Sequence, residues 1–246
     1  MEDRLEANWN AVRQRIRDAC LAADRAPEDV ELLAVTKKVP PQVASRLFDL
    51  GQSVLGENRT PELERKAEAL EALGKRPHWH FIGPLQRNKA RRVVRLCETL
   101  HSIDTVKLLE TIDRISGEIG KRPGLYLEVK LTQETEKHGF PPAEIEDVVT
   151  RARALEHVEL LGLMGMGPRL AEAAPEERRR AASEAFGELA ELGRRMESLH
   201  PDAFRGGRTR LSMGMTGDLE EAIAQGSTTV RVGTALFEGI DVEARS

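Results

Sequence analysis

Three short segments of the sequence carry residue types that can do chemistry together. Near the amino terminus, an apolar run at residues 32–35 is followed by Thr36 and Lys37. Towards the other end, apolar residues lead into glycine-containing segments at 211–215 (Leu-Ser-Met-Gly-Met) and 230–234 (Val-Arg-Val-Gly-Thr). A lysine amine can attack a carbonyl carbon, and hydroxyl and backbone N–H groups at a glycine turn can donate several hydrogen bonds to one anion. The three segments could therefore hold an aldehyde that carries a phosphate group, provided that the fold brings them together.

The composition bounds the class of protein. The 246 residues are 32% charged and 40% hydrophobic with a formal net charge of -4, which is typical of a folded globular chain and gives no reason to expect a nucleic-acid partner. The apolar runs are too short to cross a membrane, and the first residues lack the apolar core of a secretory signal. Cys20 and Cys97 lack the spacing of metal ligands or of a disulfide framework. We therefore expect a cytoplasmic protein with no membrane partner and no metal.

Apolar runs of strand length alternate with longer segments of helical period along the whole chain. Eight runs predict strands, at 30–37, 53–58, 79–83, 99–104, 124–131, 158–166, 209–215 and 229–237. Helices are predicted at 5–23, before the first strand, and then at 41–50, 61–73, 88–97, 106–119, 143–155, 175–199 and 219–225. Because the strands are apolar rather than alternating, they predict a parallel sheet that is covered on both faces.

A closed (β/α)8 TIM barrel with an extra amino-terminal helix is the simplest fold for this order, as a single domain of residues 1–246. The alternative is an open doubly wound sheet, but no Gly-x-Gly-x-x-Gly turn follows the first strand. In a barrel, working residues sit at the carboxyl ends of the strands, and a phosphate site often follows the seventh and eighth. Closure brings the eighth strand beside the first, so we expect Lys37 and the two glycine segments to form one site.

Seven strings, in order along the chain, closely resemble the YggS/PROSC family of pyridoxal phosphate homeostasis proteins. They lie at 34–37 (AVTK), 56–58 (GEN), 80–86 (HFIGPLQ), 137–139 (KHG), 162–164 (GLM), 211–215 (LSMGM) and 230–234 (VRVGT). The resemblance implies a barrel of the alanine racemase N-terminal-domain type. It also implies that pyridoxal 5'-phosphate (PLP) is held through a lysine Schiff base, and that the protein buffers or delivers the cofactor rather than catalysing turnover.

The resemblance assigns the Schiff base to Lys37, a choice over Lys38 that side-chain alternation alone leaves open. We expect Ser212, Gly233 and Thr234 to bind the phosphate, although the glycines could simply permit tight turns. The remaining candidates lie on the strands that end at the same mouth of the barrel: Asn58 for the phenolic oxygen of the ring, His80 and Met164 against the ring, Met213 beside Ser212, and Arg231. A histidine or methionine in a barrel can equally fill the core.

Arg231 bears on whether the protein only binds the cofactor or also catalyses a reaction with it. In alanine racemase, which the family resembles, an arginine on the corresponding strand faces the pyridine nitrogen. A guanidinium only donates hydrogen bonds, so that nitrogen stays unprotonated and the ring is a poorer electron sink. A two-base racemase also needs a tyrosine, and the single tyrosine here, Tyr126, falls in the apolar fifth strand. We therefore expect a carrier rather than an efficient enzyme.

Two alternatives stay open: a PLP-dependent enzyme that acts on amino acids with Lys37 as a single base, and a scaffold protein without cofactor. Recipient PLP-dependent apoenzymes are the expected partners of a carrier. No second domain follows the eighth strand in the sequence, so we expect a monomer. A basic cluster at residues 87–95 is interpreted as a solvated helix face rather than an anion-binding surface.

Overall fold

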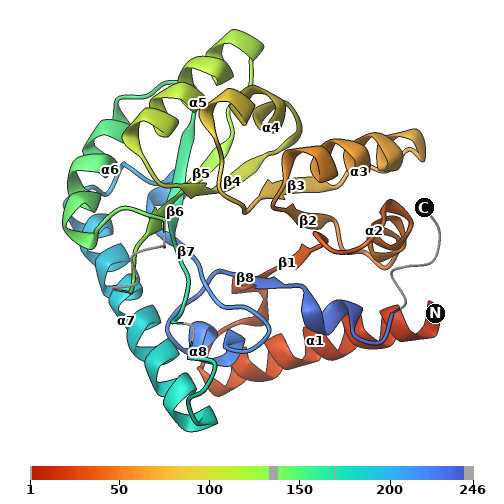
Figure 1. Ribbon diagram of the computed structural model, residues 1–246. Helices are drawn as coiled ribbons and strands as arrows, with labels where there is room; N and C mark the ends of the chain where they lie inside the picture. Colours follow the sequence, from red (N-terminus) through yellow and green to blue (C-terminus); the bar gives the residue numbers. More distant parts are fainter. Residues whose placement is uncertain (1, 133–137, 169, 241–246) are drawn as a thin grey trace.

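The computed structural model describes residues 2–132, 138–168 and 170–240. Its strands form a closed, parallel barrel in which each strand pairs with the next along the chain and the eighth pairs with the first (Figure 1). The strands are β1 Glu31–Val35, β2 Val54–Glu57, β3 His78–Phe81, β4 Thr99–Ile103, β5 Gly124–Val129, β6 Glu159–Gly165, β7 Arg210–Ser212 and β8 Thr229–Val232. The predicted barrel is therefore confirmed.

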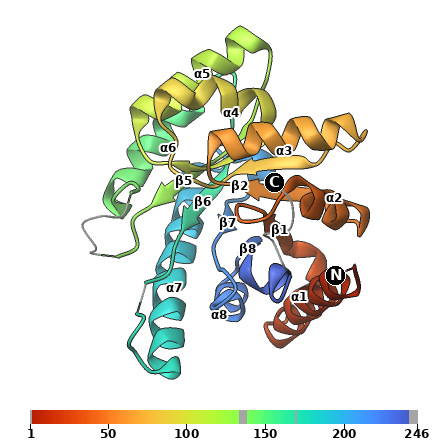
Figure 2. The ribbon, with the colours of Figure 1, turned by 45° about the vertical axis from the view of Figure 1, so that its right-hand side comes forward.

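Helices surround the strands. They are α1 Glu2–Ala22, α2 Pro41–Asp49, α3 Thr60–Ala72, α4 Ala90–Leu96, α5 Val106–Ile119, α6 Ile145–Arg153, α7 Pro175–Leu199 and α8 Leu219–Ala224. Short 3-10 turns lie at η1 Pro27–Asp29, η2 Arg87–Lys89, η3 Pro142–Glu144, η4 Arg205–Gly207 and η5 Thr234–Phe237. The extra helix α1 packs against α8 and η5, on the side of the barrel where the chain closes (Figures 1 and 2).

Local sequence signals explain the helix ends. The Thr105 side chain accepts a hydrogen bond from Leu108 N and begins α5, and Gly120 ends it in the left-handed conformation with φ 67°. Proline occupies the first turn of α2, α3 and α7, where its missing N–H costs no helical hydrogen bond.

The seventh and eighth strands are shorter than predicted. Gly214 takes φ 92°, which ends the extended backbone after β7. The eighth strand stops at Val232 because the chain turns at Gly233 and continues as η5, whose Leu236 N donates to Gly233 O at 3.0 Å. Residues 235–237 are apolar because they pack beneath α1, which a single sequence cannot distinguish from a strand interior. The first strand likewise ends at Val35 and leaves Lys37 in a turn.

Apolar side chains fill the layer between strands and helices, whereas the barrel interior holds polar side chains beside a small cluster of Tyr126, Leu161 and Met164. On β8, Val230 and Val232 belong to the outer apolar core, so alternation turns Thr229 and Arg231 inward. Side-chain contacts cross the interior between strands that are not neighbours: His101 of β4 with Ser212 of β7, the Tyr126 hydroxyl of β5 with Thr229 Oγ1, 3.4 Å away, and Arg231 of β8 with Gly165 O of β6. Barrels of this type usually fill the interior with branched aliphatic residues. A polar interior indicates that these side chains serve the site at the strand ends.

Gly162 tests the close packing of β6 against β7. A Cβ at this position would lie 1.8 Å from the backbone oxygen of Arg210, so Gly162→Ala must push two paired strands apart. We expect a loss of roughly 3 kcal/mol in the free energy of unfolding, measured by urea denaturation. Gly217→Ala is the matched control, since a Cβ there meets nothing within 4 Å, and its stability should stay within about 0.5 kcal/mol of the parent. Equal stabilities of the two variants would contradict the packing described.

Candidate functional site

A chain of buried side chains crosses the barrel from β8 to β3. Arg231 Nη1 donates to Ser212 O at 2.6 Å and to Ser212 Oγ at 2.7 Å, and Nη2 donates to Gly165 O at 3.0 Å. Ser212 Oγ lies 2.8 Å from His101 Nδ1, and His101 Nε2 lies 3.0 Å from His80 Nδ1. Three of the predicted site residues, His80, Ser212 and Arg231, are thus brought into one network.

The proton positions in this chain follow from the arginine. A guanidinium has no acceptor, so Ser212 Oγ accepts from Arg231, and the Ser212 hydroxyl hydrogen is left to find another partner. Among the described residues that partner is His101 Nδ1. His101 then donates from Nε2 to His80 Nδ1, and His80 carries its own hydrogen on Nε2. This direction gives an acceptor to both the Ser212 hydroxyl and the His101 N–H, whereas the reverse direction leaves the buried Ser212 hydroxyl without an acceptor.

Electrostatics keep both imidazoles neutral. Burial lowers the pKa of His80 to about 3, and burial together with the nearby His80 and Arg231 lowers the pKa of His101 well below its ordinary value. Burial also lowers the pKa of Arg231, to about 10, against the opposite effect of Asp218 and Glu128. At neutral pH the chain therefore consists of one guanidinium cation and two neutral rings.

Glu128 is a second titratable group beside this network, and the sequence analysis did not single it out. It is 6% exposed on β5, and alternation places it on the same interior face as Tyr126, which stacks on His101 at 4.5 Å between ring centroids. Burial and then the Asp104 carboxylate raise its pKa to about 7, and His138 and Arg231 act in the opposite direction. A charged residue inside an otherwise apolar strand was the signal that could have identified it.

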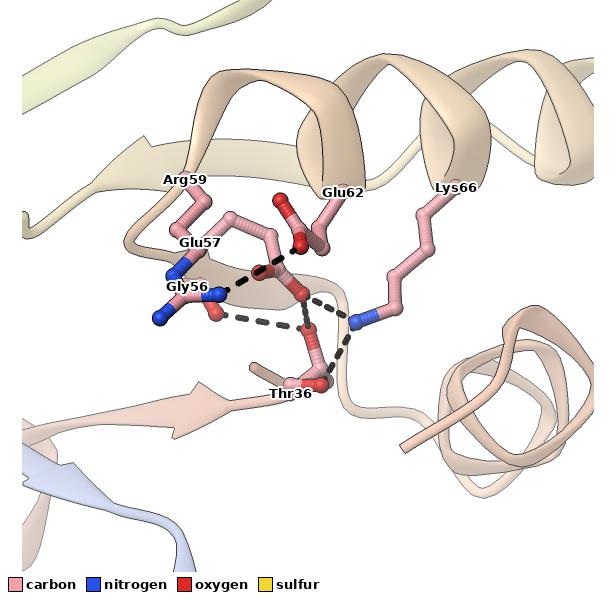
Figure 3. A network of polar contacts seen from close by, with 6 residues as sticks. All are labelled: Thr36, Gly56, Glu57, Arg59, Glu62 and Lys66. Atoms are coloured by element: carbon pink, nitrogen blue, oxygen red, sulfur yellow. Dashed lines mark hydrogen bonds and ion pairs between the residues drawn. The ribbon is translucent and has the colours of Figure 1, made fainter. Parts of the chain in front are cut away.

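The turn that carries Lys37 is fastened by a second network (Figure 3). The Thr36 hydroxyl donates to Glu57 Oε1 at 2.7 Å, and Lys66 of α3 donates to Thr36 O at 2.6 Å and forms an ion pair with Glu57. Lys66 is 1% exposed and Glu57 is fully buried, so neither charge is stabilised by water. Burial lowers the pKa of Lys66, and Glu57 offsets part of that effect. The ends of β1 and β2 are thereby tied to one helix.

The ends of β8 and β1 lie against each other, as expected from barrel closure. A Cβ at Gly233 would lie 3.2 Å from Val35 O, and Val35 is two residues before Lys37. In the part of the chain that the structure describes, the backbone N–H groups of Gly214, Thr234 and Ala235 have no hydrogen-bond acceptor, and Gly214 is buried. Unpaired buried N–H groups are rare in folded proteins. N–H groups without an acceptor, at the ends of the neighbouring strands β7 and β8, are able to bind a phosphate group.

The other predicted residues are placed as follows. Lys37 and Thr234 are exposed, Asn58 and Gly233 are half-buried, and Met164 is buried beside Tyr126. Met213 is buried too, but its side chain packs in the outer apolar core, so only its backbone faces the strand ends. Gly214 is a required turn as well, because its φ is positive and a Cβ there would lie 2.5 Å from Ala222 Cβ.

Two expectations need comment. The Ser212 hydroxyl is fully buried and already donates to His101, so donating to a phosphate would require the chain to be broken there. Lys137, in the string at 137–139, lies outside the described residues. In the basic cluster, Arg91 and Arg92 form ion pairs with Glu118 of α5 and Glu64 of α3 on the surface.

None of the helices within the described ranges is long and apolar enough to cross a membrane. Side chains of His, Cys, Asp and Glu nowhere gather in a group of three that could hold a metal ion, again within those ranges.

The chain is similar to known proteins over most of its length. Residues 2–240 match the family model described as alanine racemase, N-terminal domain. The pyridoxal phosphate homeostasis protein of Haemophilus influenzae is 32% identical over 234 residues, which cover 95% of this chain and 94% of that protein. The protein of the same name from Aquifex aeolicus is 35% identical over 226 residues, covering 92% and 94%.

A solved structure extends the likeness to three dimensions. PipY of Synechococcus elongatus PCC7942, with PLP bound, matches with a TM-score of 0.80 at 32% identity, covering 95% of this chain and 99% of that one. The fold is therefore that of a barrel of the alanine racemase N-terminal-domain type. Within that class, the chain belongs to the family of pyridoxal phosphate homeostasis proteins.

Removing Lys66 tests the buried ion pair. Lys66→Met leaves the Glu57 carboxylate buried without a cation, so we expect the free energy of unfolding to fall by roughly 3–5 kcal/mol. The double variant Lys66→Met/Glu57→Gln removes both charges and should recover most of that loss, which a double-mutant cycle in urea measures. Arg180→Met, which breaks an exposed pair with Glu184, should change stability by no more than about 0.5 kcal/mol. Additive effects of the two buried substitutions would show that the pair is not coupled.

Glu128 predicts a pH dependence of stability. Its folded pKa of about 7 lies above the ordinary carboxyl value of 4.5, so the unfolded chain loses this proton at a lower pH than the folded protein, and the fold loses stability as the pH rises from about 4.5 to about 7. Glu128→Gln stays neutral and avoids that loss. We expect the stability of the variant relative to the parent to increase by about 2.5 kcal/mol between roughly pH 5 and pH 8, measured by urea denaturation. A difference that does not vary with pH would mean that Glu128 ionises freely in the folded protein.

Proposed function

We propose that the protein binds PLP reversibly as a Schiff base with Lys37, and that it acts as a carrier or regulator of the cofactor rather than as an enzyme. The observation that carries this proposal is the meeting of the Lys37 turn with the unpaired N–H groups after β7 and β8. The family supports it, since relatives are named for pyridoxal phosphate homeostasis and PipY has a structure with PLP bound. A single domain, a monomer and a cytoplasmic location are parts of the same proposal.

The choice of Lys37 over Lys38 is supported by the direction of Thr36. The Thr36 side chain donates to Glu57, whose carboxylate pairs with Lys66 of α3, so it points outward, and the Thr36 N–H still makes a ladder hydrogen bond with Gly56 O at 2.9 Å. Alternation one residue further favours an inward direction for Lys37. When bound, the cofactor supplies an aldehyde for the amine and an anionic phosphate for the glycine turns.

The network around Arg231 disfavours turnover. Three of its N–H hydrogens are engaged with Ser212 and Gly165, which fixes the plane of the guanidinium and leaves two hydrogens to donate. A fixed donor facing the pyridine nitrogen would hold it unprotonated. Tyr126, the one tyrosine, is 2% exposed and engaged with Thr229, so it is not a free second base.

Two alternative functions are separated by experiment. A single-base enzyme would exchange the α-hydrogen of amino acids, so absence of deuterium exchange across a broad panel of amino acids supports the carrier. A scaffold would bind no cofactor at all. Recipient apoenzymes are tested by transfer of PLP from the loaded protein to an apoenzyme of that class.

The binding proposal is tested with the purified protein and added PLP. We expect a visible absorbance band that is lost in Lys37→Ala and kept in Lys38→Ala, because only Lys37 forms the covalent bond. Borohydride reduction followed by peptide mapping should place the label on Lys37. A label on another lysine, or an unchanged band in Lys37→Ala, would refute the assignment.

A further inference from the structure

A cavity of about 420 Å³ lies at the amino-terminal end of the barrel, between α1, the start of β1 and the segment after α2. Its apolar lining includes Ile16, Val30 and Leu32. Val30 and Leu32 stand at the beginning of β1, whereas Lys37 follows its end, so the length of the strand separates the cavity from the candidate PLP site. The cavity is therefore a different place on the molecule.

Charged side chains of both signs line this cavity without pairing. Arg13 and Arg17 stand one turn apart on α1, and Glu28 belongs to η1. None of the three has an ion-pair partner within the described residues. Arg15 on the same helix, by contrast, lies outside the lining and pairs with Glu220 of α8 at 2.5 Å. Two cations and one carboxylate, all three exposed, thus line one hollow without an ion-pair partner among the described residues.

One wall of the cavity is already ordered. The Arg13 guanidinium lies over the Trp9 ring, 4.6 Å from its centroid, and Trp9 Nε1 donates to Gln52 Oε1 at 3.3 Å. Gln52, only 7% exposed, donates in turn to Leu32 O at 2.7 Å and Val54 O at 2.9 Å. Because these side chains are held in place, a ligand need not supply the free energy to order them.

We propose that this cavity binds a free α-amino acid with an apolar side chain. The ligand carboxylate pairs with Arg13 and Arg17, its ammonium group pairs with Glu28, and its side chain covers the apolar lining. The volume lies in the range of small-molecule sites. A purely apolar ligand would leave these three charges without a partner, and a phosphate ester would meet the Glu28 carboxylate. The proposal does not depend on PLP binding.

Trp9 gives a direct readout. In Trp79→Phe it is the only tryptophan of the chain, and we expect L-leucine to change its fluorescence saturably, with a dissociation constant between about 1 μM and 1 mM. The analogues 4-methylpentanoate, which lacks the ammonium group, and 3-methylbutylamine, which lacks the carboxylate, should bind about tenfold more weakly. Calorimetry on the protein with both tryptophans repeats the measurement without the reporter substitution.

Variants that each remove one charge test which residues form the site. Arg17→Gln and Glu28→Gln should each weaken L-leucine binding by about tenfold, because each removes a charge-assisted contact. Arg178→Gln and Glu188→Gln, both exposed on α7, are matched controls that should bind as the parent does.

Three outcomes would overturn the proposal: no saturable binding up to about 10 mM, unchanged affinity in both Arg17→Gln and Glu28→Gln, or loss of binding in Lys37→Ala. The last would place the amino acid at the candidate PLP site. These binding measurements report on the cavity alone. L-leucine binding can therefore be absent while the absorbance test of Lys37 succeeds, and it can be present while that test fails.

Discussion

The contact between β8 and β1 is the constraint on which the site depends. It sets Gly233 against Val35 and so brings the turn after β8 to the turn that carries Lys37, although the two segments are separated by most of the chain. Each turn is also fixed by contacts with a helix on the outside of the barrel. Lys66 and Glu57 fasten the β1 side to α3, and α1 covers η5 on the β8 side. Neither the amine nor the unpaired N–H groups would have a defined position without this closure.

The polar interior sets what the site can do. In most barrels the interior is apolar and only the strand ends carry chemistry. Here Arg231 is held by Ser212 and Gly165, and its charge lies beside two neutral histidines and a carboxyl group whose pKa is about 7. A fixed cation beside neutral rings could orient an anionic, aromatic ligand without offering a strong base. This arrangement is consistent with the proposed binding without turnover.

The order of strands and helices could be predicted because each apolar run had a length and neighbours that allowed one interpretation. The end of the eighth strand could not, since residues 235–237 are apolar for contact with α1 rather than for the sheet. His101 and Glu128 were missed for a related reason. His101 matters because it contacts Ser212, and Glu128 matters because it lies near Arg231, in each case a residue on a distant strand. A single sequence does not show which strand positions face inward. The side chains of Ser212 and Met213 point in opposite directions, and this was known only once the structure gave the register of the strands.

The Asn8 side chain donates to Leu236 O at 3.2 Å and to Glu238 O at 3.0 Å, contacts that join positions 228 and 230 residues apart. During synthesis the helix that contains Asn8 emerges first and must wait for nearly all of the remaining chain before it can dock on η5. Contacts at such separation form late in folding. The turn after β8 therefore reaches its final position only when nearly the whole chain has been made, which makes this side of the barrel mouth one of the last parts of the molecule to be completed.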